Sequence, residues 1–362
     1  MNHTTSNIHI AIDAMGGDFA PACVVEGTAD ALREHPGRFA AVLVGREERI
    51  RDEIRKLPED AQRLLDDGQR CSIVHAKDVI DMHDSPTAAV KSKKDSSIGV
   101  GLTLQRSNHA DAFVSAGNTG AVLSASTLIL GRLKHVGRPT IGALIPTAKR
   151  PCLLVDAGAN VDCKPRHLFE FAVMGALYVK AMLGEANPKV GLLNIGEEDS
   201  KGNEAVQAAY KLLAGSPLNF KGNVEGRDVL KGDVDVIVCD GFVGNTLLKF
   251  GESIPSFFKT KFTALAAKSL KDKIIAGLAR NSLRPILKEL DYQEHGGVPI
   301  LGVDGVSIIG HGRSTPKAIK NMIFRAEEMV TGMVHQQIEE SLAAVQPSSD
   351  ERPIPIHTRK HE

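Results

Sequence analysis

Short apolar runs recur along the chain, and segments with the periodicity of amphipathic helices separate them. The runs are nearly continuous in apolar character, which is typical of strands buried on both faces of a parallel sheet. Regular alternation of such strands with helices predicts an α/β layered fold with a mainly parallel sheet. The predicted strands are Ile8–Ile12, Ala40–Val44, Ser72–His75, Ala112–Ser115, Cys152–Asp156, Val190–Ile195 and Val234–Asp240.

The pattern continues to residue 345 without an internal repeat or a clear linker. We therefore expect residues 8–345 to form a single catalytic α/β domain. Residues 1–7 are expected to form a flexible N-terminus. Residues 346–362 are polar and rich in proline, and we expect a disordered tail there. The longest nearly apolar stretch, Ala121–Leu130, is too short to span a bilayer.

Composition narrows the class of protein. The 362 residues include 44 Lys and Arg and 44 Asp and Glu, so the formal net charge is zero and no overall field favours nucleic acid. The five cysteines include no CxxC pair, which favours buried thiols in a reducing cytoplasm over a zinc ribbon or a redox motif. The N-terminus lacks the basic and apolar regions of a signal peptide, so we expect a cytoplasmic protein.

Residues 249–290 are expected to form a basic amphipathic helical segment, with Ser253 and Pro255 at a helix start. Residues 249–288 contain nine basic residues and two acidic ones. Such a segment can lie on an anionic membrane, meet an acidic protein, or pack its apolar face on the core. The apolar stripe is Ile254, Phe257, Phe258, Phe262 and Leu265. The candidate contacts with a carrier protein or membrane are Phe257, Phe258, Lys259, Lys261, Phe262 and Lys268.

Glycine-rich segments follow several predicted strands. In Asp13–Asp18 and Ser115–Ala121, glycines allow backbone N–H groups to approach a ligand, so each segment can form a phosphate or oxyanion nest. Plain turns and helix caps are the structural alternatives. Three further strand ends resemble them, and we expect all five to meet at one sheet edge, where ligands bind in such folds. These three are Asp156–Asn160, Asn194–Glu198 and Asp240–Asn245.

Charged candidates lie near these turns. Lys91, Lys93 and Lys94 precede Ser96 and Ser97, which can cap a helix, and a cation beside a helix N-terminus suits a phosphate. A solvated lysine cluster is the alternative. His295 and His311 lie beside glycines and are candidate acids or bases. No signature of a protein nucleophile, a metal site or a nucleotide-binding loop is present, so we expect no cofactor.

Together these motifs resemble one family, the phosphate acyltransferases of bacterial phospholipid synthesis (PlsX family). The resemblance covers roughly residues 8–335. Its motifs are IAIDAMGGDFAP at Ile10–Pro21, KKDSS at Lys93–Ser97, VSAGNTGA at Val114–Ala121 and DAGANVDCKP at Asp156–Pro165. Further motifs are NIGEEDSKGNE at Asn194–Glu204, GNVEGRD at Gly222–Asp228, CDGFVGN at Cys239–Asn245 and HGGVPILGVDG at His295–Gly305.

The resemblance implies a three-layer αβα sandwich, similar to phosphotransacetylases and isocitrate dehydrogenase-like enzymes, and a homodimer. It also implies transfer of an acyl group from acyl-acyl carrier protein to inorganic phosphate. The acyl phosphate would then serve a membrane enzyme that acylates glycerol 3-phosphate. His83 and Arg150 depart from the usual family pattern, outside the glycine motifs. An acyl-CoA-dependent phosphotransacetylase, an isocitrate-type dehydrogenase and a non-enzymatic membrane scaffold are the alternatives.

Because phosphate is itself the nucleophile, the protein needs to hold a dianion and stabilise an oxyanion. We predict that Asn118 donates an amide hydrogen bond to the oxyanion, and that His295 or His311 protonates the leaving thiolate. Lys91 or Lys94 would neutralise the phosphate. The residues predicted to bind phosphate or the oxyanion are Gly16, Gly17, Asp18, Lys91, Lys94, Ser97, Ser115, Gly117, Thr119, Gly120, Asn160, Asn194 and Asn245. For the last three asparagines, the alternative is that their amides fasten loops.

Overall fold

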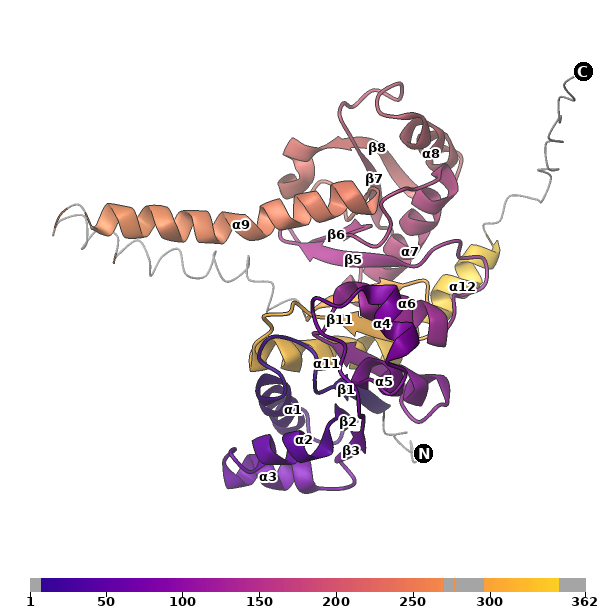
Figure 1. The fold of residues 1–362 in the computed structure, drawn as a ribbon. Coiled ribbons are helices and arrows are strands. Elements are labelled where there is room, and N and C mark those ends of the chain that lie inside the picture. Colours follow the sequence, from indigo (N-terminus) through magenta and orange to yellow (C-terminus); the bar gives the residue numbers. More distant parts are fainter. Residues whose placement is uncertain (1–7, 268, 270–276, 278–295, 345–362) are drawn as a thin grey trace, which may run out of the picture.

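The computed structural model describes residues 8–267, 269, 277 and 296–344 (Figure 1). One sheet of eleven strands forms the middle layer of the described part, in the order β3-β2-β1-β4-β11-β10-β5-β6-β9-β7-β8. The predicted flexible N-terminus (1–7) and disordered tail (346–362) lie outside the described residues, as does most of 268–290, the end of the predicted basic segment.

The sheet has two halves, joined by β10 (Val298–Leu301) and β5 (Thr140–Ile145). The first half comprises β3 (Cys71–His75), β2 (Phe39–Gly45), β1 (Ile8–Asp13), β4 (Ala112–Ser115) and β11 (Val306–Ile309). The second half comprises β6 (Cys152–Val155), β9 (Val236–Val238), β7 (Lys189–Asn194) and β8 (Asn219–Glu225).

The two halves run in opposite directions. Strand β10 is antiparallel to both β11 and β5, and β5 is antiparallel to β6, whereas the strands within each half are parallel. The carboxyl ends of the two halves therefore point to opposite edges of the sheet. The expectation that all five glycine-rich strand ends meet at one edge is wrong, because β10 and β5 reverse the strand direction between the halves.

Helices cover both faces of the sheet, which confirms the predicted three-layer αβα sandwich. One face packs α1 (Ala22–Glu34), α2 (Glu47–Ile54), α3 (Glu59–Asp66), α7 (Pro165–Leu183), α8 (Glu204–Ala214), α11 (Pro316–Thr331) and α12 (Val334–Ala344) into one apolar core. The other face carries α4 (Pro86–Ser92), α5 (Ser97–Arg106), α6 (Thr119–Ile129) and α9 (Gly241–Ala266). A 3-10 helix, Gly226–Lys231, follows β8.

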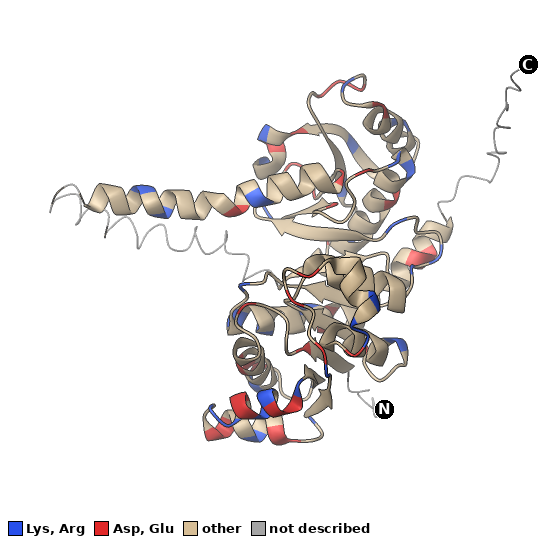
Figure 2. Cartoon of the chain, viewed as in Figure 1, with Lys and Arg blue, Asp and Glu red and all other residues tan. Residues whose placement is uncertain are grey.

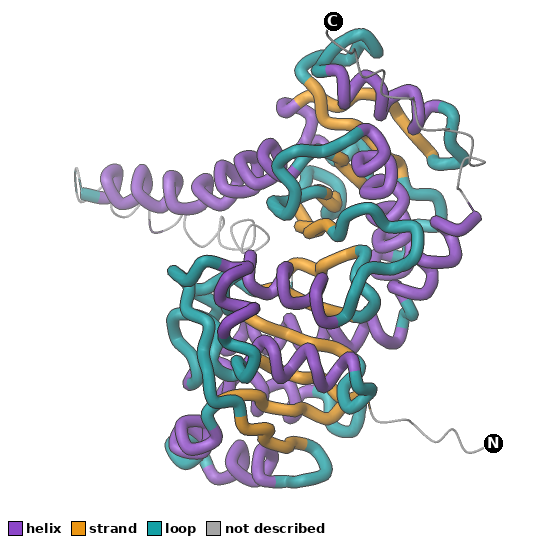
Figure 3. Tube along the Cα trace, turned by 45° about the vertical axis from the view of Figure 1, so that its right-hand side comes forward, coloured by secondary structure: helices purple, strands orange, loops and turns teal. Residues whose placement is uncertain are grey.

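Helix α9 begins directly after β9 and extends away from the body of the molecule (Figures 1 and 3). The Asp240 side chain caps it by accepting a hydrogen bond from the Val243 N–H at 2.9 Å. The predicted helix start at Ser253 and Pro255 is wrong, because Pro255 lies inside this continuous helix. Phe257 and Phe258 are 57% and 45% exposed, so the core-facing alternative for the stripe fails at these two residues. Within the described part, none of the helices has the length and apolar character required to cross a bilayer.

Candidate active site

Three neighbouring strands of the first half end together and their loops interlock. The loops are Asp13–Asp18 after β1, Ser115–Gly120 after β4 and Gly310–Gly312 after β11, and we call them the first loop cluster. The Asp18 N–H donates to the Gly312 carbonyl at 2.7 Å, and the Gly310 N–H donates to the Ser115 carbonyl at 2.8 Å. The backbone of this cluster is therefore held by hydrogen bonds between strands that are distant in sequence.

A buried carboxylate lies beneath the cluster. Asp13 is 2% exposed, and its Oδ2 accepts a hydrogen bond from the Ser115 hydroxyl at 2.6 Å. The Ser115 oxygen in turn accepts the Gly117 N–H at 3.0 Å, while Oδ1 of Asp13 accepts the Met15 N–H at 3.0 Å. Burial raises the pKa of Asp13 above 3.8, and hydrogen bonds from Ser115, Ser97 and the backbone only partly oppose this shift. Asp13 thus orients both glycine loops from below, a role that the sequence reasoning missed.

Two glycines allow the loops to approach so closely. A Cβ on Gly16 would lie 2.4 Å from Asp13 Oδ2 and 2.7 Å from the Gly117 backbone nitrogen, so no side chain fits there. Gly17 has a φ of +105°, a conformation that residues with a Cβ rarely adopt. These two predicted nest residues are therefore required by the geometry of the cluster.

Asn118 caps α6 and fastens a neighbouring loop. Its Oδ1 accepts the Ala121 N–H at 3.1 Å, which is the N-cap interaction. Its Nδ2 donates to the carbonyl oxygens of Asp81, Met82 and Asp84 at 3.3, 3.2 and 3.1 Å. An amide carries only two N–H donors, and both point at these carbonyls. The arrangement therefore favours a positioning role for Asn118 over the predicted hydrogen bond to an oxyanion.

The first turn of α6 provides other donors. The N–H groups of Thr119 and Gly120 have no acceptor within the helix, because the first turn of any helix leaves its N–H groups unpaired by the helical ladder. Thr119 is exposed and Gly120 is half-buried, so this turn is accessible at the surface of the cluster. The positive end of the helix dipole lies at the same place, which makes it favourable for a phosphate or an oxyanion.

Of the three lysines in the motif, Lys93 is bound within the structure, whereas Lys91 and Lys94 are exposed. Lys93 donates to the Val79 carbonyl at 2.9 Å and to Asp84 Oδ2 at 2.5 Å, and this contact lowers the pKa of Asp84. Lys91 and Lys94, the predicted phosphate partners, are exposed. Ser96 caps α5 by accepting the Gly99 N–H at 3.2 Å. Ser97 is buried and helps to lower the pKa of Asp13 against the effect of burial, so it lies beneath the cluster.

His311 belongs to the first loop cluster. Its Nδ1 accepts the Arg313 N–H at 3.1 Å, which places the proton of the neutral ring on Nε2. Partial burial lowers the pKa of His311 below 6.5, and the charges of Lys249 and Arg313 add to the shift against Glu252 and Asp18. The ring is therefore neutral near pH 7, and α9 passes close enough for Lys249 to act on it. The predicted candidates His295 and Lys268 lie outside the described residues.

The remaining predicted asparagines fasten loops at the opposite edge of the sheet. Asn160 Nδ2 donates to the Pro139 carbonyl and to Asp156 Oδ2, both at 2.8 Å. Asn245 packs against Gly158, since a Cβ there would lie 3.3 Å from that of Asn245. Asn194 holds its own loop by donating to the Lys201 carbonyl at 3.0 Å. The strands before these three residues run opposite to β1, β4 and β11, but Ala157 and Ala159 pack in the same apolar cluster as Ala121 and Val122 of α6.

The cysteines do not supply a nucleophile. All five are free thiols. Burial raises the pKa of Cys23 to about 11 and that of Cys71, Cys152 and Cys163 to about 12, while the pKa of Cys239 is also raised. A thiol with such a pKa is hardly ionised near neutral pH, and only the thiolate is strongly nucleophilic. In the described ranges no cluster of His, Cys, Asp and Glu side chains is arranged to hold a metal ion.

Comparison with solved structures gives the fold class. A phosphotransacetylase from Streptococcus pyogenes matches with a TM-score of 0.59 at 16% identity, over 90% of this chain and 94% of that one. A branched-chain phosphotransacylase from Enterococcus faecalis matches with a TM-score of 0.55 at 15% identity, over 89% and 99% of the two chains. At such low identity the likeness concerns the fold alone, and it confirms the predicted phosphotransacetylase-like architecture.

Sequence relatives give the family. The family model described as "Fatty acid synthesis protein" matches residues 8–337. The phosphate acyltransferase of Chlorobaculum parvum is 47% identical over 343 residues, covering 92% of this chain and 98% of the relative. The phosphate acyltransferase of Moorella thermoacetica is 46% identical over 345 residues, covering 95% and 98%. This chain therefore belongs to the phosphate acyltransferase family, as its motifs predicted.

Proposed function

We propose that this protein transfers a fatty acyl group from acyl-acyl carrier protein to inorganic phosphate, and so forms acyl phosphate for phospholipid synthesis. Membership of the phosphate acyltransferase family supports the reaction class. The structural observation that carries the proposal is the accessible first turn of α6 above the buried Asp13–Ser115–Gly117 network. That turn offers N–H donors to an anion.

The reaction needs only positioning and charge stabilisation. An oxygen of hydrogen phosphate attacks the thioester carbonyl carbon, a C–O bond forms, and the C–S bond then breaks. The proton of hydrogen phosphate ends on the departing thiolate, so acyl phosphate and the free thiol balance the reactants. The N–H groups of Thr119 and Gly120 stabilise the negative charge that develops in the transition state. Donors that are already fixed in position stabilise such charge most strongly. Proton donation by His311 or His295 stays a prediction.

The donor test separates this proposal from an acyl-CoA-dependent phosphotransacetylase. Purified protein should consume palmitoyl-acyl carrier protein only when phosphate is present. Palmitoyl-CoA at the same concentration should be turned over more slowly, because it lacks the protein surface of the carrier. Equal or faster turnover of palmitoyl-CoA would overturn the assignment of the donor.

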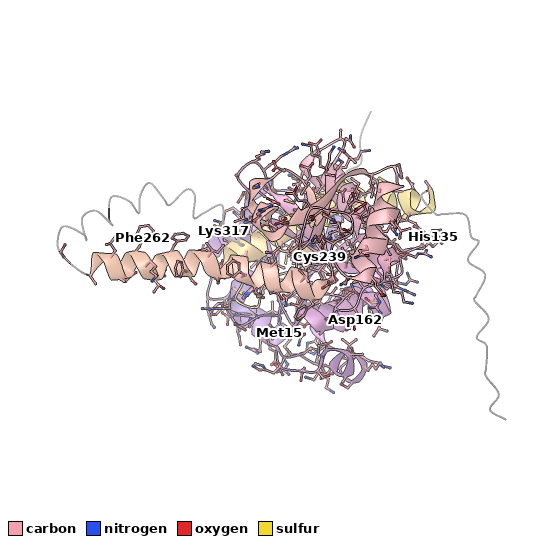
Figure 4. All side chains as sticks on the ribbon, turned by 90° about the horizontal axis from the view of Figure 1, so that it is seen from above. Met15, His135, Asp162, Cys239, Phe262 and Lys317 are labelled. Atoms are coloured by element: carbon pink, nitrogen blue, oxygen red, sulfur yellow. The ribbon has the colours of Figure 1, made fainter. Side chains whose placement is uncertain are left out.

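The cellular setting follows from the same proposal. We place the protein in the cytoplasm as a homodimer that touches the anionic membrane surface peripherally and passes its product to a membrane glycerol-3-phosphate acyltransferase. Support comes from α9, whose Phe257 and Phe258 are exposed beside Lys259 and Lys261. Aromatic side chains next to lysines suit the interface of an anionic bilayer. Phe262 lies on the same part of α9, beyond the body of the molecule (Figure 4).

A further inference from the structure

A charged groove lies beside the first loop cluster, at the carboxyl ends of β2 and β3. It has a volume of about 890 Å³ and is lined mainly by the start of α2 and by the end of β3, including Arg46, Arg49, His75 and Lys77. Strand β2 is the direct neighbour of β1, and the Ala14 N–H donates to the Val44 carbonyl at 2.9 Å. The groove therefore adjoins the loop that carries Gly16 and Gly17.

The basic side chains of this groove are not all neutralised. Arg51 pairs with Glu47 at 2.8 Å and Arg55 with Asp52 at 2.5 Å. Within the part of the chain that the structure describes, Arg49 and Lys77 form no ion pair, and both are exposed. Acidic residues are interleaved with the basic ones over α2 and α3 (Figure 2). The lining of this groove carries five basic side chains against three acidic ones, Glu47, Glu48 and Asp52, so it has an excess of two positive charges on a chain whose net charge is zero.

The groove continues toward the candidate active site. A second hollow of about 410 Å³ shares Arg46 and Arg49 with the first and reaches Asp78, Asp81 and Lys93. Its wall is the loop 78–84, which Asn118 holds at the N-terminus of α6 through three carbonyls. The same loop touches the cluster from its other side, because a Cβ on Gly312 would lie 2.9 Å from Met82 Cε. One continuous path therefore leads from Arg49 and Lys77 to the first turn of α6.

We propose that this groove is the docking surface for the acidic carrier protein, and that the thioester-bearing arm of the carrier follows loop 78–84 to the first loop cluster. The inference rests on the proposed function and adds the place at which the donor binds. Interleaved charges with a basic excess favour recognition of an acidic protein surface, since charge complementarity sets encounter rate and register. The lining includes no exposed large apolar side chain of the kind that α9 offers to lipid.

Charge reversal at the mouth of the groove tests the proposal. The double variant Arg49→Glu/Lys77→Glu should raise the KM for palmitoyl-acyl carrier protein by about tenfold at low salt, because rim charges mainly affect association. The effect should shrink as salt screens the charges. Turnover of palmitoyl-pantetheine, which carries the thioester without the protein, should change by less than about twofold. The matched control is Lys211→Glu/Lys221→Glu, two exposed lysines on α8 and β8.

The outcomes distinguish a failure of the docking surface from a failure of the proposed function. Equal KM changes in the two double variants, or equal losses with both donors, would overturn the docking surface. Acyl phosphate formation that is absent even in the unmodified protein would overturn the proposed function instead. If the reversed variant is unfolded by circular dichroism, the neutral variant Arg49→Gln/Lys77→Gln replaces it. That variant should show a smaller, donor-selective rise in KM, and an unchanged KM would refute the proposal.

Discussion

At the residue scale, the first loop cluster depends on the close approach of Gly16 to Asp13 and Gly117. Gly16→Ala would place a Cβ 2.4 Å from a carboxylate oxygen and 2.7 Å from a backbone nitrogen, so the loops have to separate. Turnover should fall by about a hundredfold, because a shift of about 1 Å in a positioning loop has that effect. The control is Gly68→Ala, where a Cβ meets nothing within 4 Å. Equal steady-state rates for both variants would show that the close approach at Gly16 is not needed for activity.

Two substitutions of Asn118 distinguish its role as the cap of α6 from its hydrogen bonds to loop 78–84. Asn118→Asp keeps an oxygen for the Ala121 N–H but loses both donors to the loop carbonyls. We expect kcat/KM to fall by about tenfold or more, while the melting temperature falls less than in Asn118→Ala. The alanine variant also loses the helix cap, which costs about 1 kcal/mol. Full activity of Asn118→Asp would show that loop 78–84 does not need this attachment.

Sequence reasoning selected Asn118 as a notable residue but did not anticipate the carbonyl partners of its amide, and its hydrogen bond to an oxyanion stays a prediction. The cap was among the alternatives, because an asparagine before a helical run is a local signal. The carbonyls of Asp81, Met82 and Asp84 are 34 to 37 residues away along the chain, and no local pattern shows that they occupy the amide. Asp13 was overlooked for a similar reason, since only its burial beside Ser115 reveals its role.

At the element scale, the predicted strands are present with shifts of only a few residues at their ends. The pattern missed β5, β8, β10 and β11. Strand β8 is mostly half-buried and contains Lys221 and Gly222, while β10 contains Pro299, so neither gives a continuous apolar run. Because β5 and β10 create the reversal between the halves, their omission led directly to the wrong expectation of a single active edge.

We predict that the exposed part of helix α9 binds the membrane surface. Phe257→Ser/Phe258→Ser should release the protein from anionic liposomes in a flotation assay and leave soluble activity intact, because both rings are exposed beyond the core. Each neighbouring lysine contributes about 1 kcal/mol at an anionic surface, so binding should also weaken with salt. Leu212→Ser/Leu230→Ser removes two apolar side chains that are 43% and 50% exposed elsewhere and serves as the control. Unchanged flotation of the phenylalanine variant would exclude this part of α9 as the anchor.

At the scale of the whole molecule, histidines link stability to pH. Burial lowers the pKa of His167, His311 and His335 below 6.5 in the folded protein. The unfolded chain therefore binds protons more readily, and the stability associated with the neutral rings is present above about pH 6.5 and lost as pH falls below it. We expect the free energy of unfolding by urea to decrease between about pH 7 and pH 5.

His335 tests that linkage, because its Nδ1 is buried and has no hydrogen-bond partner among the described residues. His335→Gln removes the titrating group, so the variant should lose less stability than the unmodified protein over the same pH interval. Lys211→Gln, at an exposed position on α8, is the control and should keep the original pH dependence. A parallel pH dependence for His335→Gln and the unmodified protein would contradict the assignment.

The overall architecture was accessible from the sequence, because alternation of buried strands and helices, together with the family motifs, defines a three-layer α/β fold. The arrangement of the site was less accessible. Ser115 and Asp13 meet across 102 positions of sequence, and Arg49 reaches the path to the site only through the packing of loop 78–84. Such neighbours depend on strand order, which apolar patterning leaves open.

The most direct test of the central claim is to incubate the protein with palmitoyl-acyl carrier protein and radiolabelled phosphate and to isolate the product. We predict labelled palmitoyl phosphate in amounts equal to the carrier thiol released, and conversion of its acyl group to palmitoyl hydroxamate on addition of hydroxylamine. Gly16→Ala should form far less of it than Gly68→Ala. Release of free palmitate and carrier thiol without label in an acyl phosphate would contradict the account, because water rather than phosphate would then be the acceptor.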